Sequence, residues 1–265
     1  MDAEREATGV DVARQYIVIA TVVFMIVAAM IGTGLFGGTN VRDLQGGALD
    51  ADATYLAPAR PAFAIWTAIY ALTIAYAVWQ ALPSQRNRVR QRAAGWWVAL
   101  TAILNGGWLL AAQFLTLVWT VVAIIALLAA LAWTLHQLQT YPGVHFTDIL
   151  FFDGAVGLHL GWVTLATVAN VSAWLTAAGV DGGAPEVWSV LVVVAVGVLG
   201  LALAIVTRGR IAVGLAMAWG LFWIGVARTD DPVAPAITAA AWIAAAIVGV
   251  FPVVLTILRA RQAPD

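Results

Sequence analysis

Long runs of apolar residues dominate the chain, and they recur with the length and spacing of membrane-spanning helices. A helix needs about 20 mostly apolar residues to cross roughly 30 Å of hydrocarbon. The pattern therefore predicts an all-α protein, a polytopic transmembrane bundle of about eight helices in which the seventh is the shortest. The eight segments that meet this length or come close to it are 15–37, 61–82, 95–115, 118–138, 148–170, 187–206, 211–227 and 235–258.

The arginines are distributed unevenly between the predicted connections, which supports the count of spans. Basic residues concentrate on the cytoplasmic side of membrane proteins. With eight spans and a cytoplasmic N-terminus, only three of the 13 basic residues, Arg42, Arg60 and Arg228, lie outside. One span more or fewer before residue 208 would place Arg208 and Arg210 opposite the arginines of 86–92. We therefore expect a multi-pass protein of the cytoplasmic membrane with both termini in the cytoplasm.

Composition strengthens this interpretation and excludes several kinds of chemistry. Hydrophobic residues make up 63% of the chain and charged residues 10%, whereas soluble domains carry about 25% charged residues. A water-exposed surface so poor in charge would aggregate, so the predicted partner is the lipid bilayer. The chain has neither cysteine nor lysine, which excludes thiolate sites and a lysine Schiff base. A net charge of −1 gives no reason to expect a nucleic-acid partner.

Ionisable residues within the predicted spans are few. Asp153 lies inside the fifth segment, with His136 as a partner for proton transfer, and His159 lies in the middle of the same segment. Asp153 has an alternative interpretation as an interfacial carboxylate near a helix start, where the helix dipole favours it. Three scattered histidines form no metal-ligand set, and no nucleophile is paired with a base. We therefore predict no catalytic residue, no metal site and no cofactor.

The 13 tryptophans are the most informative residues. Those near predicted span ends, such as Trp174 and Trp188, fit interfacial anchors. Others lie within spans beside polar or small residues, where a buried indole N–H needs an acceptor. An asparagine in hydrocarbon also needs a partner, and neighbouring glycines would leave space beside it. Three such patterns occur: Pro61 to Tyr70 with Trp66, Leu104-Asn105-Gly106-Gly107-Trp108, and Gly161 to Asn170 with Trp162.

Each pattern alone is also a common device for packing membrane helices. Together, on three helices, they predict an aromatic cavity with a few polar groups, which is the usual composition of a small-molecule site. The last three helices have little polar content, so we do not expect them to supply the main pocket.

In this order and spacing the patterns resemble the TspO/MBR family, the tryptophan-rich sensory proteins related to the translocator protein. That family has W-x-x-[IL]-Y after a proline in its second helix, L-N-x-x-W in its third and a W-x-x-[FL]-A-T-x-x-N-like run in its fifth. The matching residues here are 66–70, 104–108 and 162–170. The resemblance covers about the first five spans. It divides the chain into a five-helix TspO-like unit, 1–175, and a three-helix C-terminal extension, 176–265.

The resemblance implies a cavity for hydrophobic ligands, tetrapyrroles and sterol-like molecules among them, together with regulatory or sensory roles and frequent homodimers. We accordingly expect a membrane receptor or regulator that binds a hydrophobic small molecule, with a porphyrin among the candidates. By motif the pocket residues are Trp66, Asn105 and Trp162, joined by Tyr70, Trp108 and Asn170.

Two other functions remain open at this point. A transporter or permease for a small apolar or amphipathic solute would suit eight helices, although transporters usually contain repeats, which we do not find, and several intramembrane charges, which are scarce here. A membrane enzyme acting on a bound tetrapyrrole is the third possibility, and the absence of a recognisable catalytic set makes it the weakest.

The arginine asymmetry generates a topology prediction. Reporter domains fused after Gly38 and after Asp265 should report opposite sides of the membrane, because eight spans separate a cytoplasmic N-terminus from a cytoplasmic C-terminus. Protease or alkaline-phosphatase accessibility of the two fusions measures this. The same side for both reporters would rule the eight-span topology out.

Overall fold

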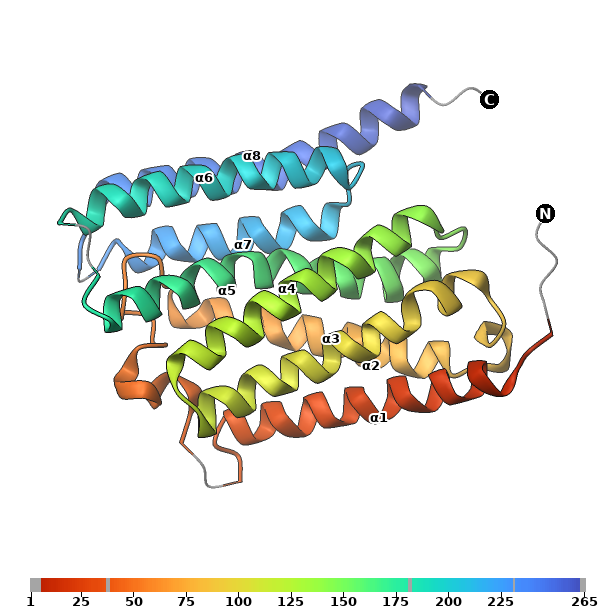
Figure 1. Ribbon diagram of the computed structural model, residues 1–265. Coiled ribbons are helices and arrows are strands. Elements are labelled where there is room, and N and C mark those ends of the chain that lie inside the picture. The colour runs from red at the N-terminus through yellow and green to blue at the C-terminus, as the bar shows by residue number, and fades with distance from the viewer. Residues whose placement is uncertain (1–5, 37–38, 181–182, 231, 263–265) are drawn as a thin grey trace. The chain divides into compact units, whose positions relative to one another are not determined.

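The computed structural model describes residues 6–36, 39–180, 183–230 and 232–262, and these residues form helices without any strand (Figure 1). The predicted all-α class and the eight predicted helices are therefore confirmed. The helices are α1 Gly9–Gly32, α2 Ile65–Gln80, α3 Val89–Phe114, α4 Leu117–Thr140, α5 Ala155–Ala177, α6 Pro185–Val206, α7 Ile211–Ala227 and α8 Pro235–Gln262.

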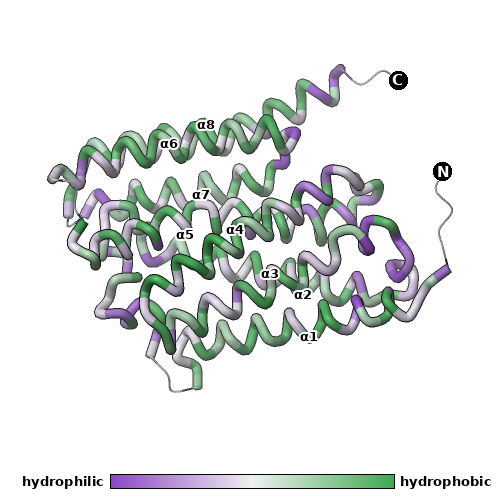
Figure 2. The backbone as a smooth tube through the Cα atoms, viewed as in Figure 1, coloured by the Kyte–Doolittle hydropathy of each residue, from purple (hydrophilic) through white to green (hydrophobic). Residues whose placement is uncertain are grey.

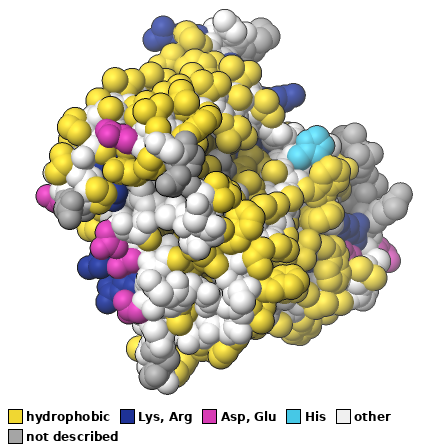
Figure 3. Space-filling model, turned by 60° about the vertical axis from the view of Figure 1, so that its left-hand side comes forward, with side chains coloured by type: hydrophobic (Ala, Val, Ile, Leu, Met, Phe, Trp, Pro, Cys, Tyr) yellow, Lys and Arg dark blue, Asp and Glu magenta, His cyan; other side chains and the backbone are white. Residues whose placement is uncertain are grey.

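Seven helical segments are long and apolar enough to cross a membrane. The exception is α7, whose 17 residues correspond to about 26 Å at 1.5 Å per residue. Apolar residues run along the helices, and hydrophilic residues gather at the ends and in the connections (Figure 2). Hydrophobic side chains also cover much of the visible molecular surface (Figure 3). Such a surface is suited to lipid and unsuited to water. The seven segments are Gly9–Gly32, Arg60–Gln80, Val89–Phe114, Leu117–Thr140, Asp148–Ala177, Pro185–Val206 and Pro235–Gln262.

Helix α1 begins six residues before the apolar segment that predicts it, at Gly9 instead of residue 15. Thr8 is the N-cap, and its backbone N–H donates to the Asp11 carboxylate in a capping box. The polar residues Asp11, Arg14 and Gln15 that follow are buried. Hydropathy alone misses this turn because its polar side chains are satisfied by neighbouring helices and not by water.

The chain divides into two compact units. The first contains Met1–Asn40 and Trp66–Val156, and so holds α1, nearly all of α2, α3, α4 and the start of α5. The second contains Val41–Ile65 and Gly157–Asp265, and so joins the first long connection to the rest of α5 and to α6, α7 and α8. The division at residue 175 that the resemblance implies stays a prediction.

In the first unit, α3 packs against both α1 and α4. Small residues on α3 allow α1 to approach closely. A Cβ at Gly106 would lie 2.5 Å from Cε1 of the Phe24 ring, and one at Gly95 would lie 2.7 Å from Cδ of Arg14. Each glycine therefore makes room for a large side chain of α1, as small residues commonly do between membrane helices.

In the second unit, α8 packs against α6 and α7, and glycines again mark the close contacts. A Cβ at Gly161 of α5 would clash with the backbone carbonyl oxygen of Val213 on α7. On α6 a Cβ at Gly200 would lie 2.6 Å from Cγ2 of Val248, and on α7 one at Gly214 would lie 2.6 Å from Cγ of Pro252. This unit is thus assembled by direct approach of helix backbones.

The contact at Gly161 yields a stability prediction. Gly161→Ala should lower the thermal unfolding midpoint of the purified protein in detergent, because the new methyl group meets a backbone atom that cannot rotate away. Overpacking of this kind typically costs ~1–3 kcal/mol.

Gly107→Ala is the matched control, since a Cβ there meets nothing within 4 Å in the part of the chain described. Alanine is favoured over glycine inside a helix by ~1 kcal/mol, so this variant should be neutral or stabilising. An equal loss of stability in both variants would contradict the close contact between α5 and α7.

Candidate functional site

Three of the predicted pocket residues lie together in the first unit. Trp66 and Tyr70 are four residues apart on α2, and their rings stack with centroids 5.2 Å apart and planes 25° apart. The Tyr70 hydroxyl donates to Oδ1 of Asn105 on α3 at 3.5 Å. Asn105 is 2% exposed, so this contact gives its side chain the partner that an amide in hydrocarbon needs. The structure therefore joins two of the three sequence motifs.

The two glycines between Asn105 and Trp108 have different surroundings. The space beside Gly106 is filled by Phe24 of α1, so this glycine allows a neighbouring helix to approach. A Cβ at Gly107 would contact nothing within 4 Å among the residues described. Trp108 follows directly on α3 and is half-buried. Gly106 is thus a packing residue, and Gly107 is the one that leaves open space.

The other two predicted residues, Trp162 and Asn170, lie on α5 in the second unit. Trp162 is 2% exposed, and its ring meets the Phe63 ring edge-on at a centroid distance of 5.7 Å. Asn170 is also buried. The predicted cavity shared by Trp66, Asn105 and Trp162 stays a prediction, because its residues belong to different units.

Helix α7 contributes aromatic residues that the sequence analysis does not assign to a site. A Cβ at Gly220 would lie 3.5 Å from Cζ3 of Trp162, so α7 directly borders that predicted site residue. Trp219 and Trp223 face each other edge-on with centroids 5.6 Å apart. Their i,i+4 spacing is visible in the sequence, but the family motifs do not include them.

The first long connection is bound to this part of α7. The indole N–H of Trp219 donates to the carbonyl oxygen of Ala62 at 2.8 Å. The backbone N–H of Ala59 donates to the carbonyl oxygen of Trp223 at 3.1 Å. Trp162, Phe63, Trp219 and Trp223 therefore form one aromatic region of the second unit, which we call the loop–α7 region together with the connection 41–65.

A family model described as TSPO-like protein matches residues 14–254. The chain belongs to this family. The predicted family resemblance is thus confirmed, and with the seven apolar helices it identifies an integral membrane protein. The match extends well beyond residue 175, so α6, α7 and most of α8 lie within the region that the family model describes. No curated protein and no solved structure matches the chain.

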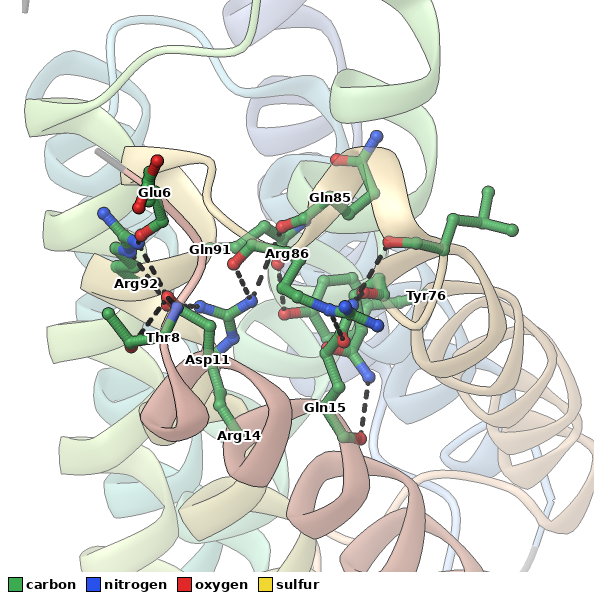
Figure 4. Close-up of polar contacts among 12 residues, drawn as sticks. Glu6, Thr8, Asp11, Arg14, Gln15, Tyr76, Gln85, Arg86, Gln91 and Arg92 are labelled. Carbon is green, nitrogen blue, oxygen red and sulfur yellow. Dashed lines mark hydrogen bonds and ion pairs between the residues drawn. The ribbon is translucent and has the colours of Figure 1, made fainter. Parts of the chain in front are cut away.

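Buried ionic contacts of this TSPO-like protein gather where the N-terminus of α1 meets the connection between α2 and α3 (Figure 4). Asp11 accepts from Arg92 at 2.6 Å and from Arg14 at 3.2 Å. Arg14 also donates to the carbonyl oxygen of Arg86 at 2.8 Å. Gln15 and Gln80 each donate to the other's backbone carbonyl, at 2.7 and 3.0 Å. The side chains bind one another and the backbone, which indicates a structural role: they hold the start of α1 against α3 and the connection between α2 and α3.

Asp153 lies in a π-helical turn, Asp148–Gly154, that leads into α5. Its carboxylate accepts from Arg90 at 2.6 Å. The same guanidinium donates to the carbonyl oxygen of Tyr141 at 2.9 Å and lies 5.0 Å from the centre of the Phe152 ring. The ion pair joins α3 to the start of α5. These contacts favour a structural role for Asp153.

No group of three or more potential metal ligands occurs among the described residues. His136, the partner considered for Asp153, lies beside Trp133 with ring centroids 5.4 Å apart.

The Arg90–Asp153 pair allows the structural role of Asp153 to be tested. Asp153→Asn should lower the thermal stability of the protein, because it removes the carboxylate that pairs directly with the buried Arg90. Removing one partner of a buried pair typically costs ~3–5 kcal/mol.

Asp43→Asn is the control, because Asp43 pairs with Arg42 at 3.6 Å with both side chains more than half exposed. Exposed pairs contribute little, so this variant should unfold at nearly the wild-type temperature. Unchanged stability of Asp153→Asn, combined with loss of proton-coupled solute uptake, would assign the residue to transport.

Proposed function

We propose that this TSPO-like protein is a membrane receptor or regulator that binds a hydrophobic small molecule, of tetrapyrrole- or sterol-like size and shape, in an aromatic intramembrane site. Family membership supports the proposal. The observation that carries it is the contact of Trp66, Tyr70 and Asn105, which places stacked aromatic rings beside a buried amide.

The chemistry of this cluster suits a flat apolar ligand with one or a few polar atoms. Stacked or edge-on aromatic contacts contribute ~0.5–1.5 kcal/mol beyond the burial of area. The Tyr70 hydroxyl and the Asn105 amide supply both hydrogen-bond donors and acceptors, which would orient such a ligand. Trp162 and Asn170 remain part of the proposed site on the basis of the motif.

We further propose that the protein resides in the cytoplasmic membrane with both termini inside, because ten of its 13 arginines fall on one predicted side. A homodimer is proposed from the family resemblance. The scarcity of charged residues in the spans disfavours the transporter alternative.

The binding proposal is tested by titrating the purified protein with a porphyrin and, separately, with a sterol. Trp66→Ala should weaken binding about tenfold, since loss of stacking worth ~1.4 kcal/mol changes a dissociation constant by that factor. Ligand absorbance or fluorescence provides the readout. Trp66 is preferable to Trp162, because truncating a fully buried tryptophan also removes ~3–5 kcal/mol of stability.

Trp174→Ala is the matched control, since Trp174 is 36% exposed and lies near the end of α5. It should bind both ligands like the wild type. Equal weakening in both variants would contradict a site at Trp66. Ligand flux across reconstituted vesicles, without saturable binding, would favour the transporter instead.

A further inference from the structure

Arg228, the residue that caps the C-terminus of α7, is 1% exposed and has no ion-pair partner among the described residues. Nη2 donates to the carbonyl oxygen of Ala51 at 3.0 Å. The guanidinium carbon lies 5.9 Å from the centre of the Tyr55 ring. Nε and Nη1 are buried and make no hydrogen bond. The positive charge of Arg228, in the loop–α7 region, is therefore only partly compensated.

The other buried arginines show how this chain normally treats such a charge. Arg14 is also 1% exposed, and although its Nε makes no hydrogen bond, its charge is paired with Asp11. Arg90 pairs with Asp153. A buried charge is strongly unfavourable unless it is paired and hydrogen-bonded. At Arg228 the helix C-terminus, the Tyr55 ring and the more distant charge of Asp52 supply only part of this compensation, and burial lowers the pKa of its guanidinium.

Other polar atoms of the loop–α7 region are also buried without a partner. They are the Thr54 hydroxyl, next to Tyr55 in the connection, and the indole N–H of Trp223 on α7. The indole and the guanidinium nitrogens can only donate, and the hydroxyl can donate as well. Trp223 precedes Arg228 by five residues, which is roughly 7–8 Å along a helix axis. The region thus combines unmatched donors with aromatic surface over the length of a small amphipathic molecule.

We propose that Arg228, together with Thr54, binds the carboxylate of an amphipathic ligand whose apolar body lies against the aromatic residues of the loop–α7 region. This inference rests on the proposed function and specifies the ligand class as an apolar carboxylic acid. A guanidinium binds a carboxylate through charge-assisted hydrogen bonds, which are about twice as strong as neutral ones.

The charge of the surroundings favours a monovalent carboxylate over a phosphate. The connection 41–65 contains two arginines and three aspartates, and Asp230 and Asp231 follow Arg228 in the sequence, so acidic residues outnumber basic ones in these two segments. Asp50 is already held by Arg60 at 2.7 Å, and this hydrogen bond keeps the pKa of Asp50 below its ordinary value. A single negative charge matches Arg228, whereas a dianion would be repelled more strongly by the remaining carboxylates, of which Asp52 is near enough to act on Arg228.

The experiment compares a porphyrin that carries one free carboxylate with its methyl ester, each titrated against the full-length protein in neutral-lipid nanodiscs. The wild type should bind the acid at least about tenfold more tightly than the ester, because hydrogen bonds to charged groups contribute ~1.5–3 kcal/mol. Arg228→Met should reduce the affinity for the acid to that for the ester and leave the ester unchanged. Arg42→Gln removes an exposed arginine from the same connection and should keep the preference.

The outcomes separate this inference from the proposed function. Equal binding of acid and ester by the wild type, or a preference that survives in Arg228→Met, overturns the inference alone. The wild-type comparison decides this even if Arg228→Met does not fold. Displacement of the acid by phosphatidylglycerol in the nanodisc would identify a phosphate occupant and also overturn it. Binding of neither probe would overturn the proposed function and the inference with it.

Discussion

Hydrocarbon offers no hydrogen-bonding partner, so each polar group within the spans of this protein must be satisfied by the protein itself. The first unit shows how far this requirement shapes the fold. Asp11 holds two arginines from different helices, and Arg90 ties Asp153 to α3. The Tyr70 hydroxyl meets the Asn105 amide. Apart from Asp11–Arg14, which lies within α1, each contact joins separate helical segments, so the few polar residues determine which helix faces can lie together in an otherwise uniform apolar bundle.

Small residues supply the complementary constraint, because apolar side chains gain little by leaving lipid for another apolar surface. Close approach of backbones increases dispersion contacts and makes helix pairs specific. Gly106 accepts the Phe24 ring, and Gly161 brings α5 onto the backbone of α7 at Val213. A glycine in such a sequence therefore has two opposite meanings. It can mark a packed contact or an opening for a ligand, and the adjacent residues Gly106 and Gly107 show both.

The number and class of the helices follow from the sequence because a membrane span has a fixed length and an apolar composition. The polar start of α1 could not be predicted in this way, because a hydropathy profile does not show that Asp11, Arg14 and Gln15 form hydrogen bonds inside the protein. The Trp66, Tyr70 and Asn105 contact follows from motifs with helical spacing. The docking of the connection 41–65 on α7 could not be predicted, because it depends on single hydrogen bonds to backbone carbonyl oxygens between segments more than 150 residues apart.

The second unit places the first long connection, α5 and α7 in one body, and this changes how the family motifs should be interpreted. Trp162 belongs to a motif of the first five helices, yet its neighbours include Gly220 of α7 and Phe63 of the connection. A residue whose indole is enclosed by later helices cannot respond to a ligand independently of them. Helix α7 is therefore part of the surroundings of the Trp162 motif.

Helix α7 ends at Arg228, whose charge is incompletely compensated. The same helix that borders the aromatic residues therefore also brings a positive charge to the edge of the loop–α7 region. An apolar surface selects ligands weakly by size, whereas a buried cation selects by sign of charge. For the ligand that we propose, discrimination among hydrophobic molecules would accordingly depend more on α7 and the connection than on the tryptophans that define the family.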